Sequence, residues 1–261
     1  MSQVRACEIY DLLNELAPFD TAEAFDNAGF LLGRTDALVE NVLCALDVTM
    51  EVVEEAKKLN AQLIVSHHPL FFHGHKNLRE GLPENDVICE LIRSHIALIS
   101  AHTNLDKSAL SGSACAARKL NLQNIRQESY LFIGDVEGGG MRADELGQKI
   151  RTLLQAPLRI FGNQNEIIHA LAIAGGAYGE GYQEILDGHL GAEAYLTGEI
   201  RHHETVDAVA RGLVLYEGGH YATEQLLVPE LADYLQTRLN ALQYTVRVYP
   251  STCVAYPGAL V

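Results

Sequence analysis

The sequence predicts an α/β protein built from two interlinked α/β domains with mostly parallel sheets. Short apolar runs at residues 42–46, 62–65 and 96–100 alternate with amphipathic stretches of helical length. This alternation is typical of a parallel sheet covered by helices on both faces. Several of the apolar runs end directly in polar side chains, and an open parallel sheet binds its ligands at that edge. The fold class and the position of a site are therefore predicted together.

The first half of the chain contains three predicted strands and the helices that connect them. Residues 4–16 carry apolar residues at helical spacing and end before Pro18. Residues 25–33 turn into a short strand, and Thr49 is the expected N-cap of a helix that runs to Leu59. The other predicted elements are strands at 42–46, 62–65 and 96–100, a polar loop at 73–82, and helices at 83–95 and 108–120.

The second half resumes the same alternation after a looser stretch. The pattern weakens over residues 126–141, where Gly138-Gly139-Gly140 is the best hinge candidate. We therefore place an approximate boundary between domains 1–126 and 127–261, with a helix from about residue 220 returning to the first domain. The predicted elements that follow are helices at 144–154, 182–190, 202–210 and 220–239, and strands at 158–161, 168–174, 194–196, 213–216 and 244–248.

Composition excludes several classes of partner. The net charge is −15, so no basic patch is expected to neutralise the phosphates of a nucleic acid or an anionic membrane. No apolar run approaches the ~20 residues of a membrane span, and the N-terminus lacks the apolar core of a signal peptide. We expect a cytoplasmic protein. The five cysteines are scattered without a Cys-x-x-Cys pair, which indicates neither a thiolate zinc site nor a redox motif.

Side chains capable of binding a metal follow the predicted strands. Asp47 follows the first strand, the pair His67-His68 follows the second, and His102 with Asp106 follows the third. Glu199 and His220 follow strands of the second half. Because the carboxyl ends of parallel strands meet at one edge of a sheet, we expect each group to gather at the edge of its own sheet.

The spacing of these residues favours two metal ions. Adjacent residues of an extended chain point to opposite sides, so His67 and His68 are expected to bind different ions. His220 and Glu224 have the i, i+4 spacing that places both on one helix face. Asp106 would add an oxygen ligand, although Asp106 or Ser108 is equally suited to cap the next helix.

Other candidates stay open at this stage. His73 and His75 in the loop, and His202 and His203 at a helix start, are either metal ligands or solvated side chains. Glu199 is a possible acidic residue that contacts a metal ligand rather than the metal itself. The glycine-rich residues 175–181 lack the Gly-Lys-Ser/Thr of a phosphate-binding loop and indicate a tight turn. No Gly-x-Ser-x-Gly motif supports a serine hydrolase.

Four motifs together resemble the NGG-interacting-factor-like family of dinuclear-metal proteins, many of which are labelled GTP cyclohydrolase I type 2 homologues. The motifs are Ser-His-His-Pro-Leu-Phe-Phe at 66–72, Ala-His-Thr-Asn-Leu-Asp at 101–106, Thr-Gly-Glu at 197–199 and Gly-His-Tyr-Ala-Thr-Glu at 219–224. The resemblance covers nearly the whole chain, in the short form without an inserted middle domain. Phe25 stands where the family usually has tryptophan, a change expected to affect packing only.

The resemblance implies five metal ligands, a site between the two domains and a ring-shaped homohexamer. His68 and Asp106 would hold one ion, His67 and His220 the other, and Glu224 would bridge them. Such ligands suit Zn, Fe, Mn, Co or Ni. His102 is the first candidate for proton transfer or for orienting a ligand.

We therefore expect a metal-dependent hydrolase of a small nucleotide- or phosphate-containing molecule, with a GTP cyclohydrolase-like reaction as its most specific form. The alternatives are a non-catalytic metal-binding, regulatory or adaptor protein, and a redox di-iron protein.

Overall fold

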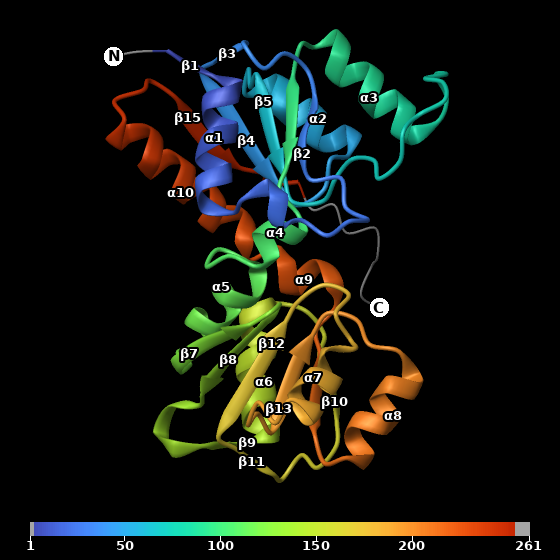
Figure 1. Ribbon diagram of the computed structural model, residues 1–261, viewed down its shortest axis with the longest axis vertical. Coiled ribbons are helices and arrows are strands. Elements are labelled where there is room, and N and C mark those ends of the chain that lie inside the picture. The colour runs from blue at the N-terminus through green and yellow to red at the C-terminus, as the bar shows by residue number, and fades with distance from the viewer. Residues whose placement is uncertain (1–2, 254–261) are drawn as a thin grey trace. The chain divides into compact units, whose positions relative to one another are not determined.

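The computed structural model describes residues 3–253 and contains two compact α/β units (Figure 1). The first unit takes Met1–Ser108 together with Val228–Val261, and the second takes Ala109–Leu227. This division differs from the expected boundary between residues 126 and 127. Residues 109–126 join the second unit because a helix and an edge strand there pack on its sheet. The chain then returns to the first unit, where its last strand completes the other sheet.

The first unit is organised around a five-stranded sheet with the strand order β15-β4-β5-β6-β2. Strands β15, β4, β5 and β6 are parallel to their neighbours, and β2 is antiparallel to β6. The elements assigned by chain position are β1 (Val4–Arg5), α1 (Ala6–Leu16), η1 (Phe19–Thr21), β2 (Gly29–Leu32), β3 (Leu38–Val39), β4 (Asn41–Ala45), α2 (Met50–Lys58), β5 (Leu63–Ser66), α3 (Pro83–Arg93), β6 (Ala97–Ser100), α4 (Thr103–Asp106), α10 (Leu227–Ala241) and β15 (Arg247–Pro250).

The central strands of this sheet are buried on both faces, which explains their continuous apolar sequence. Leu43 and Ile64 are paired across β4 and β5 and so face the same side of the sheet, where they pack with Val52 of α2 and Leu91 of α3 in one apolar cluster. Helix α2 begins where Thr49 accepts a hydrogen bond from the backbone N–H of Val52 at 3.4 Å, as its N-cap position predicts.

On the other side of this sheet lie α1 and α10 (Figure 1). The two helices are joined by an ion pair of 2.6 Å between Arg238 and Glu15. The side-chain amide of Gln236 in α10 also accepts a hydrogen bond from the backbone of Val248 in β15, at 2.9 Å. This hydrogen bond holds the last strand, β15, against α10.

The second unit contains a six-stranded mixed sheet with the order β10-β14-β13-β12-β8-β7. Only β12, β13 and β14 form parallel pairs, and the outer strands are antiparallel. Its elements are α5 (Gly112–Lys119), β7 (Gln123–Glu128), β8 (Leu131–Asp135), η2 (Glu137–Gly139), β9 (Met141–Arg142), α6 (Ala143–Leu154), β10 (Arg159–Phe161), β11 (Ile167–Ile168), β12 (Ala170–Ala174), α7 (Gly181–Asp187), β13 (Ala194–Thr197), α8 (His202–Ala210), β14 (Val214–Glu217) and α9 (His220–Glu224).

Two apolar clusters cover the two faces of this sheet. Leu171 and Tyr216 pack with Ile150 of α6 on one face. Ala172 and Leu215, their neighbours along the strands, pack with residues of α7 and α8 on the opposite face. Successive side chains of a strand point to opposite faces of the sheet, so each buried strand packs against the helices on both faces.

Several predicted elements require correction. The loose region around 126–141 contains the antiparallel pair β7 and β8, and β8 is buried. The helix expected at 108–120 begins at Gly112, after Ser111, whose hydroxyl accepts a hydrogen bond from the N–H of Ala114. The strand expected at 244–248 runs from Arg247 to Pro250.

The long helix expected at 220–239 is two helices, α9 and α10. Pro229 provides the physical reason. A proline inside a helix has no N–H to donate, and its ring clashes with the carbonyl four residues earlier, here that of Gln225. Pro229 is tolerated in the first turn of α10, so the break falls between Glu224 and Leu227. No helix within residues 3–253 is long and apolar enough to span a bilayer.

Candidate metal centre

Strand β5 delivers two adjacent histidines to the carboxyl edge of the first sheet. The backbone N–H groups of His67 and His68 donate to the carbonyls of Ala45 and Leu46, at 3.1 and 2.9 Å. The pairing of β5 with β4 therefore continues for two residues past the end of β5. The parallel strand β6 delivers His102 to the same edge. This confirms that polar residues following β5 and β6 gather where their strands end.

The three imidazole rings converge. The ring centroids of His67 and His68 are 5.1 Å apart, and those of His102 lie 5.1 and 5.6 Å from them. One ring nitrogen from each histidine can be chosen so that all three lie within 4.8 Å of one another, a spacing suited to a metal ion. The expectation that the two adjacent histidines point to opposite sides is wrong, because β5 ends at Ser66 and the chain bends at His67 and His68, which brings their rings together.

Each of these histidines has its Nδ1 atom engaged with an acceptor. Nδ1 of His67 is 2.9 Å from the carbonyl oxygen of Ala101, and Nδ1 of His68 is 2.7 Å from Oδ1 of Asp47. Nδ1 of His102 is 2.9 Å from Oδ1 of Asp26. A carbonyl or carboxylate oxygen only accepts, so Nδ1–H is the donor in each ring, and in the neutral form of the ring Nε2 carries the lone pair. An Nδ1–H held by an oxygen acceptor, with Nε2 on the other side of the ring, is typical of metal-binding histidines.

Asp26 is a site residue that its position in a predicted turn does not reveal. Its side chain is fully buried and accepts hydrogen bonds from His102, from the backbone N–H of Thr103 at 3.0 Å and from the Thr103 hydroxyl at 2.5 Å. Burial alone would raise the pKa of Asp26, but these hydrogen bonds and the adjacent imidazole outweigh it and lower the pKa to about 2. Asp26 is therefore an ionised acceptor at neutral pH.

Helix α4 positions Asp106 in the first unit. The N–H of Asp106 donates to the carbonyl of His102 at 3.0 Å, and the side chain of Asn104 donates to the carbonyl of Ala17 at 2.8 Å, which fixes the short helix. Asp106 Oδ1 then lies 3.5 Å from Nε2 of His67. The structure thus places this carboxylate beside His67, whereas the resemblance pairs it with His68. Asp106 does not cap the next helix, which Ser111 caps.

In the second unit, α9 presents His220 and Glu224. Nε2 of His220 lies 3.0 Å from Oε2 of Glu224, as the i, i+4 spacing predicts. Nδ1 of His220 lies 3.6 Å from Oε1 of Glu199, which follows β13. Because β13 and β14 are parallel, both segments leave the sheet at the same edge. These three residues form the second group of potential ligands.

Glycines make room for the Glu224 carboxylate, which is nearly buried. A Cβ atom on Gly176 would lie 2.0 Å from Oε1 of Glu224, and one on Gly112 would lie 2.9 Å from its Cα atom. The N–H of Gly176 donates to the hydroxyl of Thr223 at 3.0 Å, so the glycine turn is bonded to α9. The turn predicted at residues 175–181 therefore serves the site by close backbone approach.

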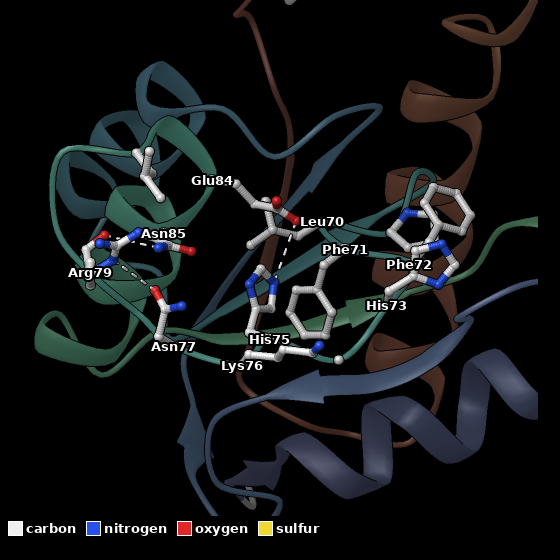
Figure 2. Close-up of a pocket in the computed structure, with 13 residues that line it drawn as sticks. Leu70, Phe71, Phe72, His73, His75, Lys76, Asn77, Arg79, Glu84 and Asn85 are labelled. Atoms are coloured by element: carbon white, nitrogen blue, oxygen red, sulfur yellow. Dashed lines mark hydrogen bonds and ion pairs between the residues drawn. The ribbon is translucent and has the colours of Figure 1, made fainter.

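The remaining histidine candidates lie outside these two groups. His202 and His203 are exposed in the first turn of α8. His73 and His75 lie in the loop after β5, where they line a pocket (Figure 2). Glu199, at 61% side-chain exposure, is the most accessible carboxylate near His220.

Comparison with known proteins gives a consistent result over the whole chain. Residues 4–257 match the family model described as Duf34/NIF3 (NGG1p interacting factor 3). A Clostridium perfringens protein called GTP cyclohydrolase 1 type 2 homolog is 30% identical over 246 residues, covering 90% of this chain and 92% of that protein. A Helicobacter pylori protein called GTP cyclohydrolase 1 type 2 is 27% identical over 239 residues, covering 89% of this chain and 95% of that protein.

Solved structures agree with the fold. The crystal structure of a Staphylococcus aureus protein matches with a TM-score of 0.92 at 27% identity, covering 99% of each chain. A Bacillus cereus protein related to NIF3 matches with a TM-score of 0.93 at 20% identity over the full length of both chains.

Proposed function

Because this chain belongs to the Duf34/NIF3 family, we propose that it is a dinuclear metal-dependent hydrolase acting on a small nucleotide- or phosphate-containing molecule. The observation that carries the proposal is the shared state of His67, His68 and His102. Each has Nδ1 held by an oxygen acceptor, which directs Nε2 away from that acceptor and toward a ligand.

The proposed ligands are those implied by the family resemblance. They are His67, His68 and Asp106 from the first unit and His220 and Glu224 from the second. Imidazole nitrogens and carboxylate oxygens suit Zn, Fe, Mn, Co or Ni. The cradle formed by Gly176 fits the set, because a side chain at this position would occupy the space that the buried Glu224 carboxylate takes. Two bound divalent ions would supply an activated water and stabilise negative charge that develops on the substrate.

The protein's own residues have definable roles around that centre. Asp47 holds the His68 ring and Asp26 holds the His102 ring. We assign His102 to proton transfer or to orientation of the centre, since its Nδ1–H is fixed and its Nε2 can accept a proton. The names of the relatives support a GTP cyclohydrolase-like reaction, in which water attacks the ring carbon of a purine imidazole.

Metal analysis and a nucleotide-hydrolysis assay on the same preparations test the proposal. We expect two divalent ions per wild-type chain and turnover of a purine nucleotide such as GTP. His68→Ala should lose at least one ion and about 100-fold or more in rate, as expected for loss of a metal ligand. His95→Asn is the matched control, since His95 is exposed and its positive φ of 56° suits asparagine.

The outcomes separate the candidate functions. Fewer than one bound ion per chain under metal-replete conditions would contradict a dinuclear centre. Equal turnover by wild type and His68→Ala would remove this centre from catalysis. Two bound ions with no turnover of any nucleotide would favour a non-catalytic metal-binding or regulatory protein. The expected homohexamer also remains a prediction, which light scattering can measure as six copies of the 28.6 kDa chain.

A further inference from the structure

The loop that follows His68 forms a pocket that the metal centre does not use. It connects β5 to α3, and together with the start of α3 it lines an open pocket with a volume of about 700 Å³ (Figure 2). This volume is in the range of pockets that bind small molecules. All of its lining residues, from Pro69 to Asn85, belong to the first unit.

The loop has no helix or strand of its own, yet hydrogen bonds hold both of its ends. The side chain of Asn27 donates to the carbonyl of Phe71 at 2.6 Å. At the far end, the buried side chain of Asn85 donates to the carbonyl of Arg79 at 2.9 Å, and the N–H of Gly81 donates to Asp86 at 2.8 Å. A long loop that is anchored in this way is typical of binding segments.

The pocket has an aromatic side and a polar side. The ring of Phe72 meets the ring of His102 edge-on, with centroids 5.8 Å apart, so the aromatic side adjoins the histidines of the candidate metal centre. Phe71 packs edge-on against His75 at 5.1 Å. Arg79 and Asn77 lie on the opposite side of the pocket from Phe72, with His75 between them (Figure 2).

The pocket lining is positively charged, whereas the whole chain is negatively charged. The chain carries a net charge of −15, which repels anions. Lys76 and Arg79 line the pocket with Glu84 as the one carboxylate, and Glu84 lies 3.5 Å from His75. Two cations against one carboxylate give the pocket a local positive excess. This local excess favours an anionic ligand.

We propose that this pocket binds the substrate as a nucleoside phosphate. The planar base lies against Phe71 and Phe72, next to His102, and the phosphate groups lie at Lys76 and Arg79. Aromatic rings contribute about 1–3 kcal/mol per stacked base, and Arg binds phosphate through paired N–H donors. This inference rests on the proposed function for its substrate class. The pocket residues would select the substrate. In this orientation the base, and not the phosphates, lies toward the metal ligands.

Calorimetric titration of the purified protein with GTP, guanosine and inorganic triphosphate tests the pocket. The double variant Lys76→Gln/Arg79→Gln should weaken GTP and triphosphate binding about tenfold or more and leave guanosine binding unchanged, since it removes charge-assisted hydrogen bonds to phosphate. Phe72→Ala should weaken guanosine and GTP binding and leave triphosphate binding unchanged. The matched control is Lys58→Gln/Arg34→Gln, which changes the net charge equally at exposed positions outside the pocket.

The possible results distinguish this pocket from the metal centre. Equal weakening by both double variants would show a general effect of charge and overturn the pocket. Unchanged GTP binding in the pocket variant, or no binding to wild type at millimolar GTP, would overturn it too. GTP bound through Lys76 and Arg79 without any hydrolysis would keep the pocket and contradict the hydrolase. Hydrolysis by wild type with an unchanged KM in the pocket variant would keep the hydrolase and contradict the pocket.

Discussion

Oδ1 of Asp26 lies 2.9 Å from Nδ1 of His102, although 76 residues separate the two in the chain. The Asp26 carboxylate is ionised at neutral pH because its pKa is about 2. It can only accept, so it fixes the Nδ1–H tautomer of His102 and leaves Nε2 as the basic atom. A carboxylate that orients an imidazole in this way commonly tunes catalysis or metal binding.

Asp26→Asn should lower the rate of hydrolysis about 10- to 100-fold and leave the metal content unchanged. The amide cannot accept the hydrogen bonds of His102 and both Thr103 donors at once, so the imidazole loses its fixed tautomer. Rate and metal content are measured on the same samples, with Asp11→Asn on the exposed face of α1 as control. If Asp26→Asn lost metal in parallel with its rate, Asp26 would be needed for metal binding and not only for the orientation of His102.

Asp47→Asn should act on metal affinity rather than on proton transfer. Asp47 accepts from Nδ1 of His68 at 2.7 Å, and His68 is a proposed ligand. The amide oxygen of Asn can still accept this hydrogen bond but lacks the negative charge that strengthens the imidazole as a ligand, and loss of a carboxylate partner typically weakens metal binding 10- to 100-fold. Competition with a chelator measures the affinity. Asp36→Asn, which only breaks an exposed ion pair with Arg34, should leave it unchanged. Equal affinities for wild type and Asp47→Asn would contradict the proposed role of His68.

Glu55→Gln should destabilise the first unit by about 1–2 kcal/mol at pH 7. Glu55 in α2 accepts hydrogen bonds from the Ser251 hydroxyl at 2.5 Å and from the N–H and hydroxyl of Thr252, at 2.9 and 2.6 Å. Burial alone would raise its pKa, but these donors outweigh burial and lower it from the usual 4.5. The ionised carboxylate therefore stabilises the fold above pH 4.5, and the contribution is lost as the pH falls through the lowered pKa.

Denaturant unfolding at a series of pH values checks this effect. The difference between wild type and Glu55→Gln should be constant near neutrality and should shrink as the pH falls below about 4.5. Glu54→Gln is the control, because Glu54 pairs only with exposed Lys57 and should change the unfolding free energy by ~0.5 kcal/mol or less. A difference that grows on acidification would contradict the assigned direction of the pKa.

The parts of the fold that the sequence predicts are those with a strong periodic signal. Buried strands such as β4, β5 and β12 are continuous apolar runs because helices cover both of their faces. The parallel order then fixes that His68 and His102 meet at one edge. In contrast, β7 escaped prediction because all six of its residues are exposed at the sheet edge, so no apolar pattern marks it.

The parts of the candidate site that escaped prediction depend on tertiary contact. Asp26 gives no local signal, since its partner His102 arrives from a distant segment. The Gly175-Gly176 turn was predicted, but its closeness to Glu224 is visible only in three dimensions. The break before α10 had a signal in Pro229, whose effect on a preceding helix is general.

Gly176→Ala should displace the Glu224 carboxylate and remove at least half of the bound metal. The new Cβ atom would lie 2.0 Å from Oε1 of Glu224, so the carboxylate or the turn must move, and the φ of +64° adds about 1 kcal/mol of strain. Gly138→Ala separates the two effects, since Gly138 has a φ of +80° with no atom within 4 Å of the added Cβ. It should cost only the strain and retain the metal. Equal metal content in both variants would exclude Glu224 from the centre.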